Sequence, residues 1–278
     1  MSLRSLQNVL FKIYLSPGYL LAHQFDPDRF SAGFGLSGED AAIVRNLPPR
    51  ETEEFARELK AKQLSNLRYQ LPMTYGWLTE NRAEVLRGFE DISILSRLAK
   101  RGALAELFVD YVREWRDYAD LPDALPEVAR LEYLLMSARR DQDEMQRRQS
   151  KSAVSQAQPD RFSWDSVYWL KPRTVVAKFS VDALSVLLKR KEMGDAGSSI
   201  GVVISPTAAG HVPTVMRIAE PAYALLRGMD EPRRARDLRE NALDAGRKID
   251  DHSLRKLLST LENVQVVGAL HRADSDGQ

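Results

Sequence analysis

The chain has 278 residues, of which 44% are apolar and 28% charged, and its formal net charge is +1. This length suits about two domains, and the composition is that of a folded globular protein. The near-zero charge gives no general attraction to nucleic acid or acidic membranes, so we expect neither as a partner. The sequence contains no apolar run near the roughly 20 residues that span a bilayer. The absence of cysteine excludes disulfides, thiolate metal sites and a cysteine nucleophile, and it fits a cytoplasmic protein.

Residues 1–148 predict an α-helical domain. Apolar residues at helical spacing indicate successive helices that are interrupted at Pro17-Gly18 and Pro48-Pro49, with a longer helix over Glu51–Tyr69 and one or two more over 94–115. The last helix of this domain is expected to begin near Pro126, where the missing N–H loses no bond. Its apolar stripe consists of Val128, Leu131, Leu134, Leu135 and Ala138. The stripe fades into charged residues from 139 to 148, so we expect this helix to continue into solvent.

The polar segment 149–163 predicts a linker or mobile loop, and we place the domain boundary there. Four aromatic residues follow closely, and they allow two interpretations: a segment packed on the core of the second domain, or an exposed contact surface. We favour the packed interpretation. The four residues are Phe162, Trp164, Tyr168 and Trp169.

Residues 164–278 predict a second domain of mixed composition. Three short strands are expected at Thr174–Ser180, Ile200–Ser205 and Thr214–Ala219, with a helix over Val181–Met193 between the first two. Three short helices follow, at Pro221–Met229, Arg233–Ala245 and Asp250–Glu262. The expected fold is therefore an N-terminal α-helical domain followed by a C-terminal winged-helix-like α+β domain, with a three-stranded antiparallel sheet and three helices. Such a module can bind DNA, or it can hold a peptide as an extra strand.

The sequence offers no catalytic group. The four histidines, at positions 23, 211, 252 and 271, are not spaced as a metal-binding pair on one helix. There is also no nucleophile elbow, no phosphate-binding glycine loop and no dinucleotide fingerprint. We therefore predict no catalytic residue, no metal ligand and no cofactor in this chain.

The third predicted strand is the candidate binding edge. It comes last of the three strands and follows Pro213, and an exposed edge can pair with an extended peptide. The alternative is that the first domain covers this edge. Beside the strand, the last helix carries polar residues opposite the leucine stripe that it buries. The candidate peptide contacts are Thr214, Val215, Met216, Arg217, Ile218, Arg255, Lys256 and Thr260.

A DNA-binding role would require basic side chains on the last helix to face the bases and phosphates. Arg255 and Lys256 are opposed there by Asp250, Asp251 and Glu262. A winged-helix DNA-binding regulator therefore remains an alternative that we do not favour.

Three runs in the second domain resemble the precursor-recognition elements of ribosomal peptide biosynthesis. They are Arg217–Asp230, Ala235–Glu240 and Leu257–Leu270. Members of that family are winged-helix-like and bind a leader peptide as an added strand. The resemblance implies that this chain binds a ribosomally made precursor or carrier peptide.

The first domain is similar to the helical part of the partner proteins of multinuclear non-haem iron oxidases. The similarity lies in Leu121–Tyr133 and in Phe55–Lys62 leading to Leu71–Thr74. Together the two resemblances cover most of the chain, and they are nearest to the partner proteins of 3-thiaglutamate biosynthesis, with those of methanobactin biosynthesis more distant.

These resemblances imply a non-catalytic subunit of a heterodimer. The iron would belong to the other protein, an oxidase of TIM-barrel type, which excises the β-carbon of a cysteine at the C-terminus of the peptide in an oxygen-dependent reaction. One further alternative is the helical small subunit of an aromatic-ring-cleaving dioxygenase, which would leave the second domain unexplained.

Overall fold

The computed structural model describes residues 3–89, 104–149, 162–195, 197–206, 212–244 and 249–271. The chain divides into two compact units, Met1–Leu121 and Pro122–Gln278. The predicted division was different, because helix α9 (Ala124–Gln149) was expected to end the first domain. Instead, α9 packs on α10 and β3 of the second unit. Most of the predicted linker lies outside the described residues.

The first unit is helical, as predicted. Four of its described helices begin with a proline, whose missing N–H falls where a helix has no bond to lose. Each of these prolines also ends the preceding segment, which explains the close succession of helices. The helices are α1 (Leu3–Leu15), α2 (Pro17–Phe25), α3 (Pro27–Gly33), α4 (Gly38–Arg45), α5 (Pro49–Gln70), α6 (Pro72–Asn81) and α8 (Leu104–Trp115).

Apolar contacts between helices hold the described part of the first unit together. One cluster joins α1, α3 and α4 through residues such as Ile13, Phe30 and Val44. Another contact is aromatic: the ring of Phe89 meets that of Phe108 edge-on, with centroids 4.8 Å apart. The α8 helix confirms the later part of the helix predicted over 94–115, whereas the earlier part lies outside the described residues.

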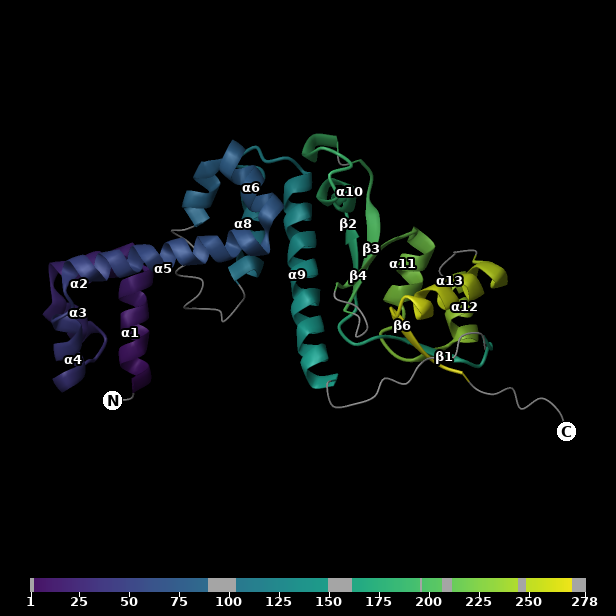
Figure 1. Ribbon diagram of the computed structural model, residues 1–278, viewed down its shortest axis with the longest axis horizontal. Helices are drawn as coiled ribbons and strands as arrows, with labels where there is room; N and C mark the ends of the chain where they lie inside the picture. The colour runs from purple at the N-terminus through teal and green to yellow at the C-terminus, as the bar shows by residue number, and fades with distance from the viewer. Residues whose placement is uncertain are drawn as a thin grey trace. The chain divides into compact units, whose positions relative to one another are not determined.

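The second unit mixes helices and strands (Figure 1). Its remaining helices are α10 (Ala183–Leu187), the 3-10 helix η1 (Met193–Asp195), α11 (Glu220–Arg227), α12 (Ala235–Asp244) and α13 (Asp251–Asn263). Its strands are β1 (Val167–Leu170), β2 (Val175–Phe179), β3 (Ile200–Ser205), β4 (Thr214–Ile218), β5 (Arg233–Arg234) and β6 (Val267–Leu270). The three predicted strands correspond to β2, β3 and β4, and the three predicted terminal helices correspond to α11, α12 and α13.

The strands form two antiparallel sheets rather than the single sheet predicted. One sheet has the order β2-β3-β4 and contains all three predicted strands. The other has the order β5-β1-β6, and none of its strands was predicted. Its central strand β1 pairs with β6, which follows it by about a hundred residues, in a register that joins Val167 to Leu270 and Leu170 to Val267. Such long-range pairing leaves no local pattern in the sequence.

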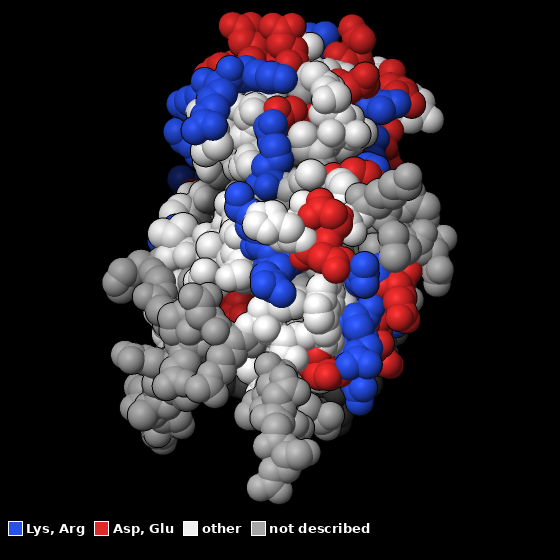
Figure 2. All heavy atoms as spheres, turned by 90° about the vertical axis from the view of Figure 1, so that its right-hand side faces the viewer, with Lys and Arg blue, Asp and Glu red and all other residues white. Residues whose placement is uncertain are grey.

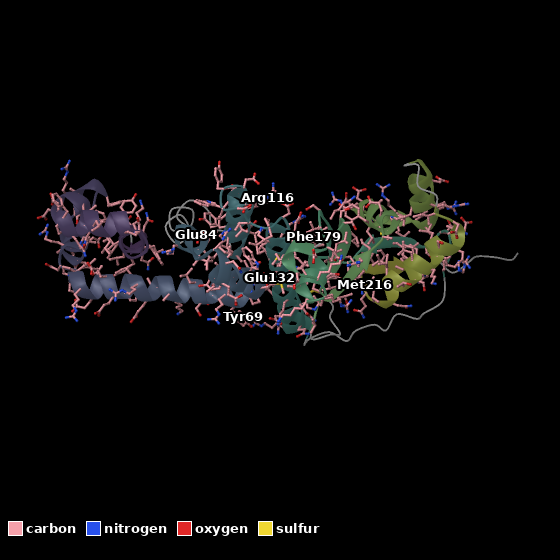
Figure 3. All side chains as sticks on the ribbon, turned by 90° about the horizontal axis from the view of Figure 1, so that it is seen from above. Tyr69, Glu84, Arg116, Glu132, Phe179 and Met216 are labelled. Atoms are coloured by element: carbon pink, nitrogen blue, oxygen red, sulfur yellow. The ribbon has the colours of Figure 1, made fainter. Side chains whose placement is uncertain are left out.

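The central strand β3 is covered on both sides. All six of its residues are buried, and the register of the sheet separates its neighbours into two faces. Val176, Val203 and Met216 lie on one face, in the core shared with α11, α12 and α13. Phe179 lies on the other face, where the guanidinium of Arg130 from α9 is 5.0 Å from its ring. Figure 3 labels Phe179 on the α9 side and Met216 toward the yellow α13.

One core joins the first face of this sheet, the three terminal helices and the second sheet. Tyr168 of β1 is 1% exposed within it, and Phe162 and Trp164 pack against it. This confirms the packed interpretation for Phe162, Trp164 and Tyr168, whereas Trp169 is half-buried and is not part of this core. Burial of each large apolar side chain here contributes on the order of 1.5–3 kcal/mol. In the part of the chain that the structure describes, no helix is long and apolar enough to cross a lipid bilayer.

Gly201 provides a test of the packing on β3. A Cβ atom at this position would lie 3.0 Å from Ile218 Cγ1 on β4 and 3.3 Å from Tyr223 Cβ on α11, so both neighbours would have to shift to admit a side chain. We expect Gly201→Ala to lower the free energy of unfolding by about 1–3 kcal/mol through overpacking. Urea unfolding measures this change. Gly194→Ala is the matched control, because a Cβ there meets nothing within 4 Å; equal effects of the two substitutions would contradict the packing.

Candidate functional site

Strand β4 forms one edge of its sheet. It pairs with β3 from Gly201–Ile218 to Ser205–Thr214, and in the described part of the chain no other strand pairs with it. On an antiparallel edge, alternate residues direct both their N–H and their C=O groups away from the sheet. Within β4, Ile218 is buried, Arg217 is exposed and the other three residues are half-buried. The strand is thus anchored by side chains while its outer backbone row has no strand partner.

Arg217 has an intramolecular role that the sequence did not reveal. Its Nη2 lies 2.5 Å from both carboxylate oxygens of Asp182 and 3.0 Å from the Ser185 hydroxyl. Asp182 is buried and also caps α10 by accepting a bond from the Ser185 N–H. This guanidinium fastens β4 to the start of α10, and the peptide contact through the Arg217 side chain stays a prediction.

The last helix α13 presents two distinct faces. Leu254, Leu258 and Leu261 are each 0% exposed and belong to the core. The helix begins as predicted: the Asp250 carboxylate accepts a 2.8 Å bond from the Ser253 N–H, an N-cap that satisfies one free N–H of the first turn. Residues spaced at i, i+3, i+4, i+7 and i+10 from His252 form the polar face.

A pocket of about 240 Å³ lies against this polar face. Eight residues line it: five from α13, one from β1, one just before β1 and one just after β6. They are Phe162, Tyr168, His252, Arg255, Lys256, Ser259, Glu262 and His271. The Arg255 guanidinium lies over the Phe162 ring, 4.8 Å from its centroid, so a cation–π contact holds one side of the pocket.

A hydrogen-bonded chain forms the other side of the pocket. His271 Nε2 is 3.0 Å from the Glu262 carboxylate and donates to it, since a carboxylate only accepts. In the neutral ring, Nδ1 then accepts from the Ser166 hydroxyl, 3.2 Å away. Burial, with a smaller effect of the Glu262 charge, raises the pKa of Tyr168 to about 12. The phenol therefore stays protonated at neutral pH and adds no negative charge to the pocket.

The structure brings together only part of the predicted set. Arg255 and Lys256 line the pocket. Thr260 does not, because its hydroxyl donates to the Lys256 carbonyl within the helix. No residue of β4 lines the pocket, so the predicted contacts fall into an edge strand and a separate pocket.

Several pocket residues were not predicted as site residues. The polar spacing of His252, Ser259 and Glu262 on the last helix could have indicated them. Phe162 and His271 come from segments far apart in the chain, and only the pairing of β1 with β6 joins them. Among the residues that the structure describes, no three His, Asp or Glu side chains are grouped to hold a metal ion.

Asp182 allows a test of how β4 is fastened. Burial alone raises the pKa of Asp182, but hydrogen bonds from Ser185 and Arg217 outweigh it and hold the pKa below its ordinary value of 3.8. We expect Asp182→Ala to lower the free energy of unfolding by about 2 kcal/mol, through the lost cap and ion pair. Chemical denaturation at neutral pH measures this loss.

The pH dependence of the stability of Asp182→Ala tests the direction of the pKa shift of Asp182. A depressed folded-state pKa gives stability that is present above pH 3.8 and disappears as the pH falls through the folded-state pKa. The gap between wild type and Asp182→Ala should therefore narrow in acid. Asp195→Ala, at an exposed residue of the same unit, is the control and should change stability by less than about 0.5 kcal/mol. A stability difference between wild type and Asp182→Ala that widens in acid would contradict the lowered pKa of Asp182.

No protein-family model and no curated protein matches this chain. What the site can do is therefore inferred from its own geometry, which consists of the anchored edge strand β4 and a polar pocket beside α13.

Proposed function

We propose that this chain is a non-catalytic subunit that recruits an extended peptide for an iron-dependent oxidase carried by another protein. The observation that carries the proposal is the edge of β4, which pairs with β3 alone among the described strands. An extended peptide can add to such an edge through backbone hydrogen bonds, with its side chains giving specificity. The iron, as the only cofactor, would belong to the partner enzyme.

The connectivity of the second sheet supports a winged-helix-like arrangement. The elements α11, β5, α12, α13 and β6 follow one another as helix, strand, helix, helix and strand. In a winged helix the central strand comes after these elements, whereas here β1 precedes them and takes the middle position. We interpret the unit as a winged-helix-like module with its central strand supplied from upstream, and β2-β3-β4 as an added sheet.

The charges on the terminal helices favour peptide over DNA. Arg236 pairs with Asp165, and Arg239 pairs with Asp251 at 2.7 Å while lying 5.5 Å from the Trp164 ring centroid. Figure 2 shows the face that carries α12 and α13, where basic side chains form a narrow band next to acidic ones. Phosphate contacts supply most non-specific DNA affinity, so the pairing of Arg236 and Arg239 weakens this face as a DNA surface, although Arg255 and Lys256 of α13 have no such ion pair among the described residues.

The partner assignment rests on the resemblance of the first domain to the helical part of oxidase partner proteins. We assign a TIM-barrel-type multinuclear non-haem iron oxidase, acting on a carrier peptide as in 3-thiaglutamate biosynthesis by β-carbon excision at a C-terminal cysteine. Holding the leader on this subunit would raise the effective concentration of the reactive end at the iron site.

Amide hydrogen exchange tests strand addition on β4. The probe is a carrier peptide that ends in cysteine, the class of substrate that the proposed function assigns. At a peptide concentration of 100 times Kd, alternate amides of β4 should exchange roughly 100-fold more slowly, since only about one molecule in a hundred stays free. The outer edge of β2 serves as the internal control and should not change.

Methylated peptides sharpen this test. Two versions of the peptide, each N-methylated on one alternate set of backbone amides, differ only in which edge they can present to a strand. One should lose at least about tenfold in affinity, and the other should bind normally. Equal affinities, or protection spread over every β4 amide, would refute strand addition.

Co-expression tests the partner. We expect the tagged chain to co-purify with a co-expressed multinuclear non-haem iron oxidase, and the complex to contain iron. An aromatic-ring-cleaving dioxygenase large subunit serves as the competitor in the same experiment. Selective recovery of that subunit would replace the proposed function with the small-subunit alternative, and a salt-sensitive gel shift with DNA would replace it with the regulator.

A further inference from the structure

The pocket beside α13 carries an unbalanced positive charge. Its lining includes Arg255 and Lys256 and one carboxylate, Glu262. Two positive charges and one negative leave a single net positive charge on these three groups. Tyr168 stays protonated and does not alter this balance. A ligand with one negative charge would therefore neutralise the pocket.

The charged side chains of the pocket differ in whether they already have a hydrogen-bond or ion-pair partner. Glu262 accepts the hydrogen bond from His271 and is only 21% exposed, so it is turned into the hydrogen-bonded chain. Arg255 lies on the Phe162 ring, and this contact leaves its N–H groups at the edge of the guanidinium free to donate. Among the described residues, neither Arg255 nor Lys256 forms a salt bridge. Their donors are thus the groups in the pocket that are available to an anion.

The apolar residues that line the pocket limit which class of anion fits there. The rings of Phe162 and Tyr168 face the same space as the basic groups, so a ligand with methylene groups next to its charge would contact both. A phosphate group carries about −1.5 to −2 charges at neutral pH, which exceeds the net charge of Arg255, Lys256 and Glu262 together, and Glu262 repels it more strongly than it repels a singly charged carboxylate. A carboxylate on a short aliphatic stem fits both the charge and the surface.

We propose that this pocket binds the carboxylate of an acidic side chain in an extended peptide, with Arg255 and Lys256 as donors and Phe162 against the methylene groups. The carboxylate selectivity depends only on the pocket. The assignment of that carboxylate to the recruited peptide rests on the proposed function. The pocket is separate from β4, so it would bind a side chain of the peptide that strand addition alone does not recognise.

The first arm of the test uses a small probe and the full chain. The probe is glutamate with its α-amino group acetylated and its α-carboxyl group converted to a methylamide, which carries one carboxylate like a glutamate inside a peptide. Its glutamine counterpart is the neutral control. Backbone amide signals of α13 in the NMR spectrum should shift when the glutamate probe is added. The chain should bind this probe at least about tenfold more tightly than the glutamine probe, since hydrogen bonds to charged groups are the stronger ones.

Substitutions locate the site. Lys256→Gln and Arg255→Gln should each weaken the glutamate probe by roughly tenfold. Arg227→Gln is the matched control, because it removes one positive charge from an exposed position on α11 of the same unit. Equal binding of the two probes, tighter binding of inorganic phosphate, or equal effects of Arg227→Gln and Lys256→Gln would each overturn the carboxylate site.

The second arm uses the same carrier peptide that ends in cysteine and its variants with single Asp or Glu residues changed to Asn or Gln. One such change should weaken binding to the wild-type chain by roughly tenfold and have no further effect on Lys256→Gln. If the small probe binds as expected but the peptide does not bind at all, the pocket stands and the proposed function fails. If the peptide protects β4 but no acidic position matters, the proposed function stands and this assignment fails.

Discussion

The second unit depends on the burial of one short strand. All six residues of β3 are buried, and its sequence Ile-Gly-Val-Val-Ile-Ser offers no polar face that could meet water. A strand of this kind needs a cover on both sides. Helix α9 covers one face, and α11 with the terminal helices covers the other. This requirement explains why α9 belongs to the second unit although the polar segment after it resembles a boundary.

The same constraint decides what β4 can offer. Once β3 is covered on both faces, the side chains of β4 also point into covered faces: Met216 and Ile218 toward the core and Arg217 toward α10. The side chains are therefore occupied with fastening the strand. What remains for a partner is the outer backbone row, and that row recognises extended chains with little regard to their sequence. Selectivity must then come from elsewhere, and the pocket on α13 is a polar, partly enclosed surface among the described residues of the same unit.

How much of this structure the sequence predicted depends on how far apart in the chain the interacting residues lie. Strands β2, β3 and β4 carry compact apolar runs, and α13 carries leucines at helical spacing, so local patterns predicted them. The two residues of β5 and the four of β1 and β6 carry no such pattern, and they become strands only through pairing across long stretches of chain. The site divided in the same way: Arg255 and Lys256 stood on a recognisable polar face, but Phe162 and His271 reach the pocket only through that pairing. The role of Arg217 was hidden because Asp182 lies 35 residues away.

A single core supports both candidate binding elements, and this bears on their affinity for a flexible ligand. Met216 and Ile218 of β4 and Leu254, Leu258 and Leu261 of α13 all pack into one cluster. Arg255 is further restrained by Phe162, and Glu262 by His271. Ordering side chains on binding costs about 0.5–1.5 kcal/mol for each flexible one. Since these groups are held before any ligand arrives, most of the ordering cost falls on the peptide, and a modest number of contacts then suffices for recruitment. A partner enzyme needs such recruitment to be reversible, because the processed peptide has to leave.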